Sequence, residues 1–178
     1  MKIVKVNVHQ HDMQLKAPCA IAGRVTESVQ NIFVAIQVNQ EIKGIGTGAP
    51  SPDVTGENFA AAYNKLQYMA DKMISGDIDN EGHILERLQS AMTDSPAVRA
   101  AIDMALFDLL AKSEETPLLE RVGQVHESFP TSITIGVASL EQTIKHARNH
   151  LQDGFKILKL KIGEKMLEMT DEMRKNLQ

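Results

Sequence analysis

The sequence contains a single cysteine, Cys19, among its 178 residues. One cysteine excludes an intrachain disulfide, and this usage fits a reducing compartment such as the cytoplasm. No stretch approaches the ~20 consecutive apolar residues of a membrane span, and the first residues lack the apolar block of a signal peptide. The net charge of −4 provides no basic surface for nucleic acid. We therefore expect a cytoplasmic protein that binds neither membranes nor nucleic acid.

The composition is ordinary for a globular protein, with 43% hydrophobic and 24% charged residues. Alternation of apolar and polar residues predicts strands over 2–9, 31–39 and 42–47, and the last two are close enough to form a hairpin. Strands at the start followed by apolar-striped helices predict an α+β domain.

Three helices are expected after these strands. Thr55 is the predicted N-cap of the first helix, and a second helix is predicted near 80–92. The third begins with Ser95 as N-cap and Pro96 at the first helical position. Its near-continuous apolar run predicts a buried helix over 97–111, whose core residues include Ile102, Leu106 and Leu109.

The pattern changes to alternating strands and helices after Pro130. Residues 131–135 read as a short strand, and Ser139 with Gln142 forms a capping box at the start of a helix. Gly154 is placed to end that helix, a strand follows over 156–162, and a helical tail carries Met166, Met169 and Met173. The domain boundary is therefore predicted near 125–130, with one domain over 1–127 and a second over 128–178.

The strand over 156–162 places Lys159 and Lys161 on one face and Leu158 and Leu160 on the other, because side chains alternate with period two. By spacing alone, such a strand is typical of a sheet edge that shows lysines to water. The order of strand, helix, strand and helix instead indicates a parallel sheet. In a barrel, the leucine face would meet the outer helices, and both lysines would point inward near the C-terminal end of the strand, where barrel active sites lie.

Four segments together resemble the enolase superfamily, and within it the dipeptide epimerases of the muconate-cycloisomerase-like subgroup. They are the glycine-rich segment 44–57, the long helical segment 101–118, the strand 132–135, and the segment 154–163 with its Lys-x-Lys motif. Their order and spacing cover roughly residues 1–165. The resemblance implies a capping domain over 1–127, followed by the first two β/α units of an incomplete TIM barrel.

The resemblance also implies a chemistry, in which a proton is removed next to a carboxylate and bound Mg²⁺ stabilises the enediolate that forms. Lys161 matches the acid/base on one face of the substrate, and Lys159 matches its partner, which supports the developing oxyanion. Arg24 matches an arginine placed to hold the side-chain carboxylate of an Ala-Glu-like dipeptide, and Thr134 matches a position that lines the pocket. A solvated loop arginine and an ordinary strand threonine are the alternative interpretations.

The remaining catalytic groups of the family lie beyond these strands. Three carboxylates that ligate the metal, and the opposing lysine, belong to later barrel strands that residues 1–178 do not include. We therefore expect no metal ligands here and no activity from this chain alone. Two alternatives remain: a non-catalytic remnant that self-associates or binds a partner, and a relative of muconate cycloisomerases or acylamino-acid racemases. A small dipeptide is the expected partner of the full-length family, and a homo-oligomer is the expected assembly.

Three other groups of residues are interpreted as structural. Gly44, Gly46 and Gly48 do not open a helix as a phosphate-binding loop would, so turns or close backbone approach explain them better. His146 and His150 have the spacing of metal ligands on one helix face, but no third ligand is evident. Asp108 lies in the apolar helix and is expected to bond nearby backbone.

Overall fold

The computed structural model describes residues 1–161 except 22–23, 40, 75, 77 and 79–93. Contacts divide the chain into two compact units. Unit 1 contains Met1–Met13 and Val29–Val125, and unit 2 contains Gln14–Ser28 together with the chain from His126 onward. The predicted domains over 1–127 and 128–178 differ from these units at residues 14–28, which the prediction assigns to the first domain and the contacts assign to unit 2.

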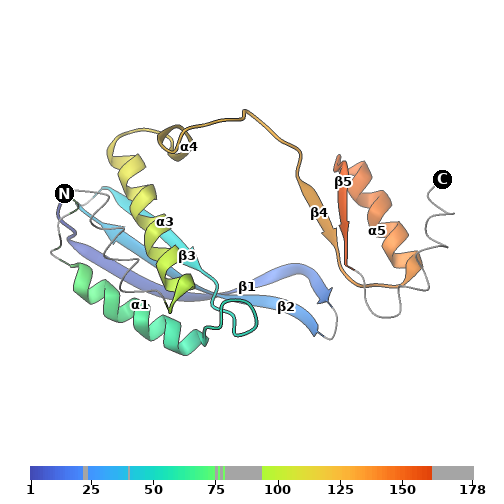
Figure 1. The fold of residues 1–178 in the computed structure, drawn as a ribbon, viewed down its shortest axis with the longest axis horizontal. Coiled ribbons are helices and arrows are strands. Elements are labelled where there is room, and N and C mark those ends of the chain that lie inside the picture. The colour runs from blue at the N-terminus through green and yellow to red at the C-terminus, as the bar shows by residue number, and fades with distance from the viewer. Residues whose placement is uncertain (22–23, 40, 75, 77, 79–93, 162–178) are drawn as a thin grey trace. The chain divides into compact units, whose positions relative to one another are not determined.

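The N-terminal part of the chain forms a three-stranded sheet in the order β1-β2-β3 (Figure 1), and residues 14–28 of its first two strands are assigned to unit 2. The strands are β1 (Lys5–Ile21), β2 (Arg24–Gln37) and β3 (Lys43–Gly48). β2 and β3 are antiparallel, with Val34 opposite Gly46, which confirms the predicted hairpin. β1 and β2 are both longer than the predicted strands. Residues 9–16 of β1 are exposed and carry no alternation of buried and exposed side chains, so the sequence pattern did not reveal this part of the strand.

Two long helices follow the sheet in unit 1. α1 spans Phe59–Met73 and α3 spans Pro96–Ser113, with the short α4 (Leu118–Arg121) after them. The predicted cap of the first helix was wrong: Asn58 caps α1, accepting a hydrogen bond from the Ala61 amide at 3.2 Å. Thr55 closes the preceding turn instead, where its hydroxyl bonds the backbone of Ser51. The helix predicted near 80–92 lies outside the described residues.

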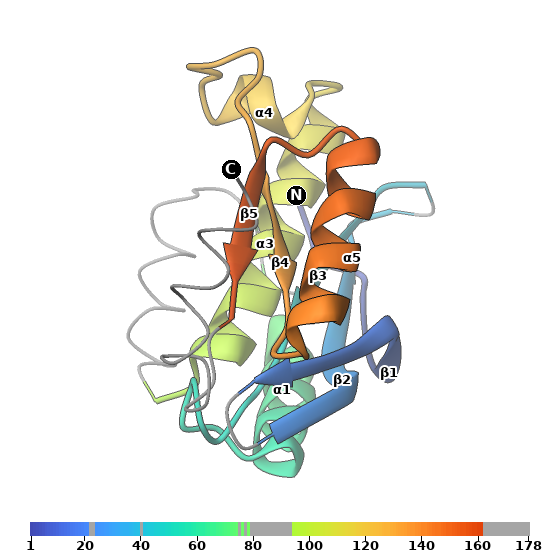
Figure 2. The same ribbon diagram turned by 90° about the vertical axis from the view of Figure 1, so that its right-hand side faces the viewer.

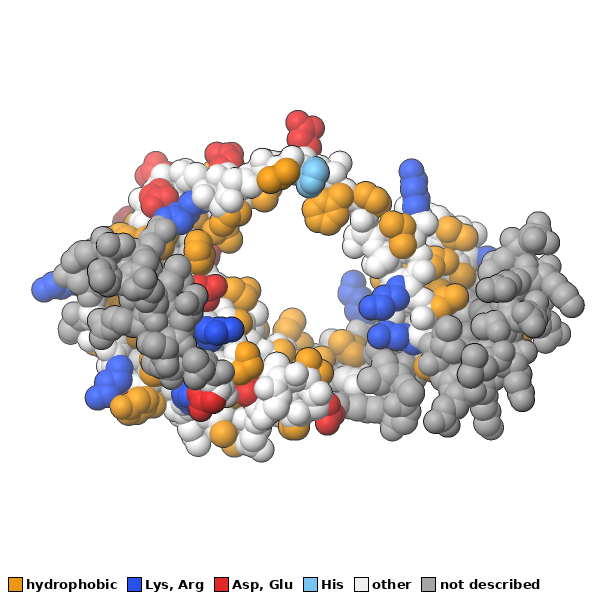
Figure 3. Space-filling model, in the orientation of Figure 1, with side chains coloured by type: hydrophobic (Ala, Val, Ile, Leu, Met, Phe, Trp, Pro, Cys, Tyr) orange, Lys and Arg blue, Asp and Glu red, His pale blue; other side chains and the backbone are white. Residues whose placement is uncertain are grey.

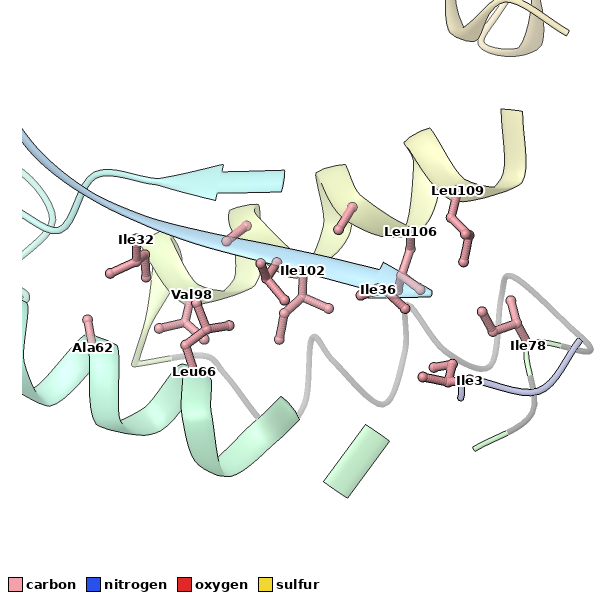
Figure 4. Packing of buried hydrophobic residues seen from close by; sticks show 13 residues of the cluster. Ile3, Ile32, Ile36, Ala62, Leu66, Ile78, Val98, Ile102, Leu106 and Leu109 are labelled. Carbon is pink, nitrogen blue, oxygen red and sulfur yellow. The ribbon is translucent and has the colours of Figure 1, made fainter. Parts of the chain in front are cut away.

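The core of unit 1 lies among β2, α1 and α3. Figure 4 shows Leu66 of α1 pointing toward Val98 of α3, and both side chains are fully buried. The predicted core residues of α3 are confirmed, since they are at most 2% exposed: Ile102, Leu106 and Leu109. Burying such a side chain contributes about 1.5–3 kcal/mol. The apolar packing among β2, α1 and α3 is therefore the main stabilisation of the unit.

α3 packs on β3 closely enough to exclude side chains from one face of the strand. A Cβ at Gly44 would lie 1.9 Å from the carbonyl oxygen of Ala105, and one at Gly46 would lie 1.9 Å from that of Ala101. At Gly48, the corresponding distance to the Ala97 carbonyl oxygen is 2.2 Å. The three glycines therefore serve close backbone approach, as the sequence indicated, and β3 meets the helix along its length.

Polar contacts from α3 also protect the backbone of β3. The Ile45 amide donates to Asp108 Oδ2 at 2.8 Å, and Lys112 donates from Nζ to the Lys43 carbonyl at 3.1 Å. Lys112 also forms an ion pair with Asp108 at 2.7 Å. This confirms the structural interpretation of Asp108. Side chains of α3 thus form hydrogen bonds with backbone groups of β3 that a free strand edge would offer to another chain.

The N-terminus of α3 is capped by a residue far away in the sequence. Ser95 occupies the N-cap position but makes no side-chain capping bond. The carboxylate of Glu57, only 6% exposed, accepts from the Ala97 amide with its two oxygens at 2.9 and 3.2 Å. A carboxylate at this end of a helix satisfies a free amide and opposes the positive end of the helix dipole.

We expect Glu57→Ala to lower the free energy of unfolding by about 1–3 kcal/mol, because a buried amide loses its acceptor. Glu57→Gln should cost less, since an acceptor remains. Ser95→Ala is the matched control and should cost less than Glu57→Ala, because the Ser95 side chain makes no capping hydrogen bond. Urea denaturation followed by circular dichroism measures all three. Equal losses for Ser95→Ala and Glu57→Ala would contradict the assignment of the cap to Glu57.

Unit 2 contains a parallel β/α unit made of β4 (Ser132–Ile135), α5 (Leu140–Gln152) and β5 (Ile157–Leu160). Figure 2 shows the arrows of β4 and β5 running in the same direction with α5 beside them. Ser139 caps α5 by accepting from the Gln142 amide at 3.3 Å. The helix ends at Gln152, and Gly154 follows its C-cap with a φ of 92°, which favours glycine. The Ser139 cap and the stop signal at Gly154 were both correctly predicted. The predicted helical tail after residue 161 lies outside the described residues.

The observed architecture is therefore an α+β unit followed by the start of a parallel β/α repeat, as the sequence predicted. In the described part of the chain, none of the helices is sufficiently long and apolar to cross a membrane.

Candidate functional site

The candidate site lies at the C-terminal ends of β4 and β5. In the parallel register of these strands, Thr134 pairs with Lys159, and Ile135 pairs with Leu160. Paired residues in a sheet point to the same face, so Thr134 and Lys159 share one face and Ile135 lies on the other. The structure thus brings two of the predicted site residues together, although they come from different strands.

The two faces of this small sheet differ in burial. Ile135 is 2% exposed, and α5 packs on β4, where Thr143 is equally buried. Thr134 and Lys159 are both exposed. In Figure 3, Lys and Arg side chains gather beside β4 and β5 on the side away from α5. The helix therefore covers Ile135 of β4 and leaves the face with Lys159 open.

Lys161 follows directly after β5 and is held next to the end of β4. Its backbone amide donates to the Ile135 carbonyl at 2.9 Å, which extends the strand pairing by one residue. The Lys161 side chain is half-buried, in contrast to the exposed Lys159. Neither ammonium has an ion-pair partner among the described residues.

Arg24 is the first residue of β2 and belongs to unit 2 with the two lysines. Its side chain lies outside the described part of the chain. The role predicted for Arg24 therefore stays a prediction.

A protein metal site requires several ligand side chains that converge on one point. Within the described residues, no three His, Cys, Asp or Glu side chains come together as a metal site requires. His150 instead lies 3.8 Å from Asp153 Oδ2 and packs edge-on against Phe155, with ring centroids 6.0 Å apart. His146 on the same helix is exposed. The described residues therefore do not provide a cage for Mg²⁺, and the contacts of His150 are those of a helix terminus.

The shifted carboxyl groups belong to unit 1. Burial raises the pKa of Asp103, against the opposing effect of Arg99. A hydrogen bond and ion pair with Lys65 lower the pKa of Asp94. Both effects have structural causes, so neither group is a candidate for proton transfer. The buried carboxylate that the sequence did not reveal, Glu57, is likewise structural.

The arrangement of Thr134, Lys159 and Lys161 suits chemistry on an anion. Two ammonium groups and a hydroxyl can bind a carboxylate and stabilise negative charge that develops on it. An amine at the end of a barrel-type strand can also accept a proton from a bound substrate. The sequence indicated the two lysines through their Lys-x-Lys spacing and Thr134 through the family resemblance, while the pairing of Thr134 with Lys159 required the structure.

Comparison with known proteins supports a family assignment. Residues 3–123 match the N-terminal domain of mandelate racemase / muconate lactonizing enzyme. A relative from Desulforapulum autotrophicum, an L-Lys-D/L-Arg epimerase, is 40% identical over 92% of this chain and 46% of its own length. An L-Ala-D/L-Glu epimerase from Thermotoga maritima is 28% identical over 94% of this chain and 48% of its own length.

The fold of this chain is also similar to that of a solved structure. A crystal structure of a dipeptide epimerase from Methylococcus capsulatus, complexed with Mg and the dipeptide L-Arg-D-Lys, matches with a TM-score of 0.91 and 35% identity. The match covers 99% of this chain and 50% of that structure. The chain therefore spans about half the length of the relatives that it matches.

Proposed function

The chain belongs to the mandelate racemase / muconate lactonizing enzyme family of the enolase superfamily, and from this we propose that it contributes the N-terminal half of a Mg²⁺-dependent dipeptide epimerase. The observation that carries the proposal is the pairing of Thr134 with Lys159, and of Ile135 O with the Lys161 amide, at one end of a parallel β/α unit. The resemblance to a dipeptide epimerase with a TM-score of 0.91 supports it.

In the proposed reaction, the amine of Lys161 takes the proton from the α-carbon of the substrate on one face, and a proton returned on the opposite face completes the epimerisation. The electrons of the broken C–H bond move onto the adjacent carboxylate, and the ammonium of Lys159 stabilises the added charge. Thr134 lines the same face and can bond the substrate. Bound Mg²⁺ would supply further charge stabilisation, and its ligands are not among the described residues.

For the substrate, we favour a dipeptide with a cationic side chain. Two relatives named L-Lys-D/L-Arg epimerase are 40% and 37% identical to this chain, whereas three named L-Ala-D/L-Glu epimerase are 26–31% identical. Arg24 supports the second candidate, an Ala-Glu-like dipeptide. A guanidinium binds a carboxylate in bidentate fashion and repels a second cation.

A chimera tests the proposal. Residues 1–161 of this chain replace the matching part of the Methylococcus capsulatus dipeptide epimerase. We expect the chimera to epimerise a Lys/Arg dipeptide faster than Ala-Glu, while a polypeptide of residues 1–178 alone neither exchanges the α-proton nor binds Mg²⁺ tightly. Deuterium incorporation at the α-carbon, followed by NMR, measures the activity.

The controls separate a failed reaction from a failed fold. The intact Methylococcus capsulatus enzyme is the positive control, and cooperative unfolding shows whether the chimera is folded. A folded chimera without exchange on either dipeptide would contradict the proposed function. Faster turnover of Ala-Glu would contradict only the substrate and would favour the role predicted for Arg24.

We also propose that the chain self-associates. Ile157 and Leu160 of β5 are 45% and 38% exposed, and β5 pairs with only one strand among the described residues. Pairing of β5 with a second copy would extend the β4-β5 sheet and cover these side chains. Light scattering at micromolar concentration should show a dimer, and Leu160→Lys should shift it toward the monomer. A strict monomer for the unaltered chain would refute this assembly.

A further inference from the structure

We draw no further inference here: the strongest candidate, the open apolar hollow of about 460 Å³ that Phe129, Pro130, Phe155 and Lys156 line where the chain enters β4 and β5, carries nothing because nothing in the structure shows what covers it.

Discussion

Gly46→Val is expected to abolish the cooperative unfolding transition of unit 1. A Cβ at this position would lie 1.9 Å from the Ala101 carbonyl oxygen and 2.6 Å from the Ala105 amide nitrogen. Both atoms belong to the backbone of α3, so no side chain can rotate away, and the helix must separate from the strand. The loss should exceed about 3 kcal/mol, which is at or above the usual cost of overpacking and a large part of the stability of a domain.

Substitutions of smaller size and on neighbouring residues make this test more specific. Gly46→Ala adds the Cβ alone and should cost less than valine, yet still place the variant well below the unaltered chain in urea denaturation. Ala101→Gly should not rescue either variant, because the obstructing atom is a carbonyl oxygen. Ile45→Val is the matched control on the same strand, since Ile45 is 47% exposed and does not face the helix. A loss below about 0.5 kcal/mol for Gly46→Ala would refute the close packing of α3 on β3.

Lys161→Ala in the chimera is expected to reduce epimerisation by roughly a hundred- to ten-thousand-fold, the usual contribution of a positioned acid or base. Lys161 is proposed to act on one face of the substrate only. The loss should therefore affect epimerisation in both directions, while α-deuterium exchange should be lost for one diastereomer and persist for the other. A purely structural lysine would instead lower both exchange rates together.

Two further variants distinguish the roles of the lysines. Lys159→Ala should lower exchange of both diastereomers, because it removes charge stabilisation that both directions require. Lys156→Ala is the control, since Lys156 is an exposed lysine that precedes β5 at the opposite end of the strand. Its exchange rates should match those of the unaltered chimera. Equal exchange of both diastereomers by Lys161→Ala would contradict the assignment of Lys161 as the base.

Elements whose signals are local were predicted from the sequence. The apolar run of α3, the Ser139 cap of α5 and the glycine at position 154 all depend on residues within one or two helical turns. The alternation in 156–162 likewise indicated a strand and the shared face of Lys159 and Lys161. These predictions succeeded because backbone propensity and side-chain periodicity act over a few residues.

Some local signals were ambiguous, so the sequence alone predicted the wrong N-cap for α1 and too short a strand for β1. Thr55 and Asn58 are both good N-cap residues, and only the chain path shows that Thr55 bonds Ser51 while Asn58 starts α1. β1 was predicted too short because its continuation over residues 9–16 is exposed on both faces. A strand without a buried face lacks the alternation from which strands are recognised.

The sequence by itself therefore determined the order of elements, the buried helix and the spacing of the two lysines. Only the tertiary structure decided that Thr134 lies beside Lys159, that Glu57 caps a helix 40 residues away, and that Gly46 meets the carbonyl of Ala101. The physical reason is that strand register and the approach of a helix to a sheet depend on packing between distant segments. No propensity of a single segment encodes these contacts.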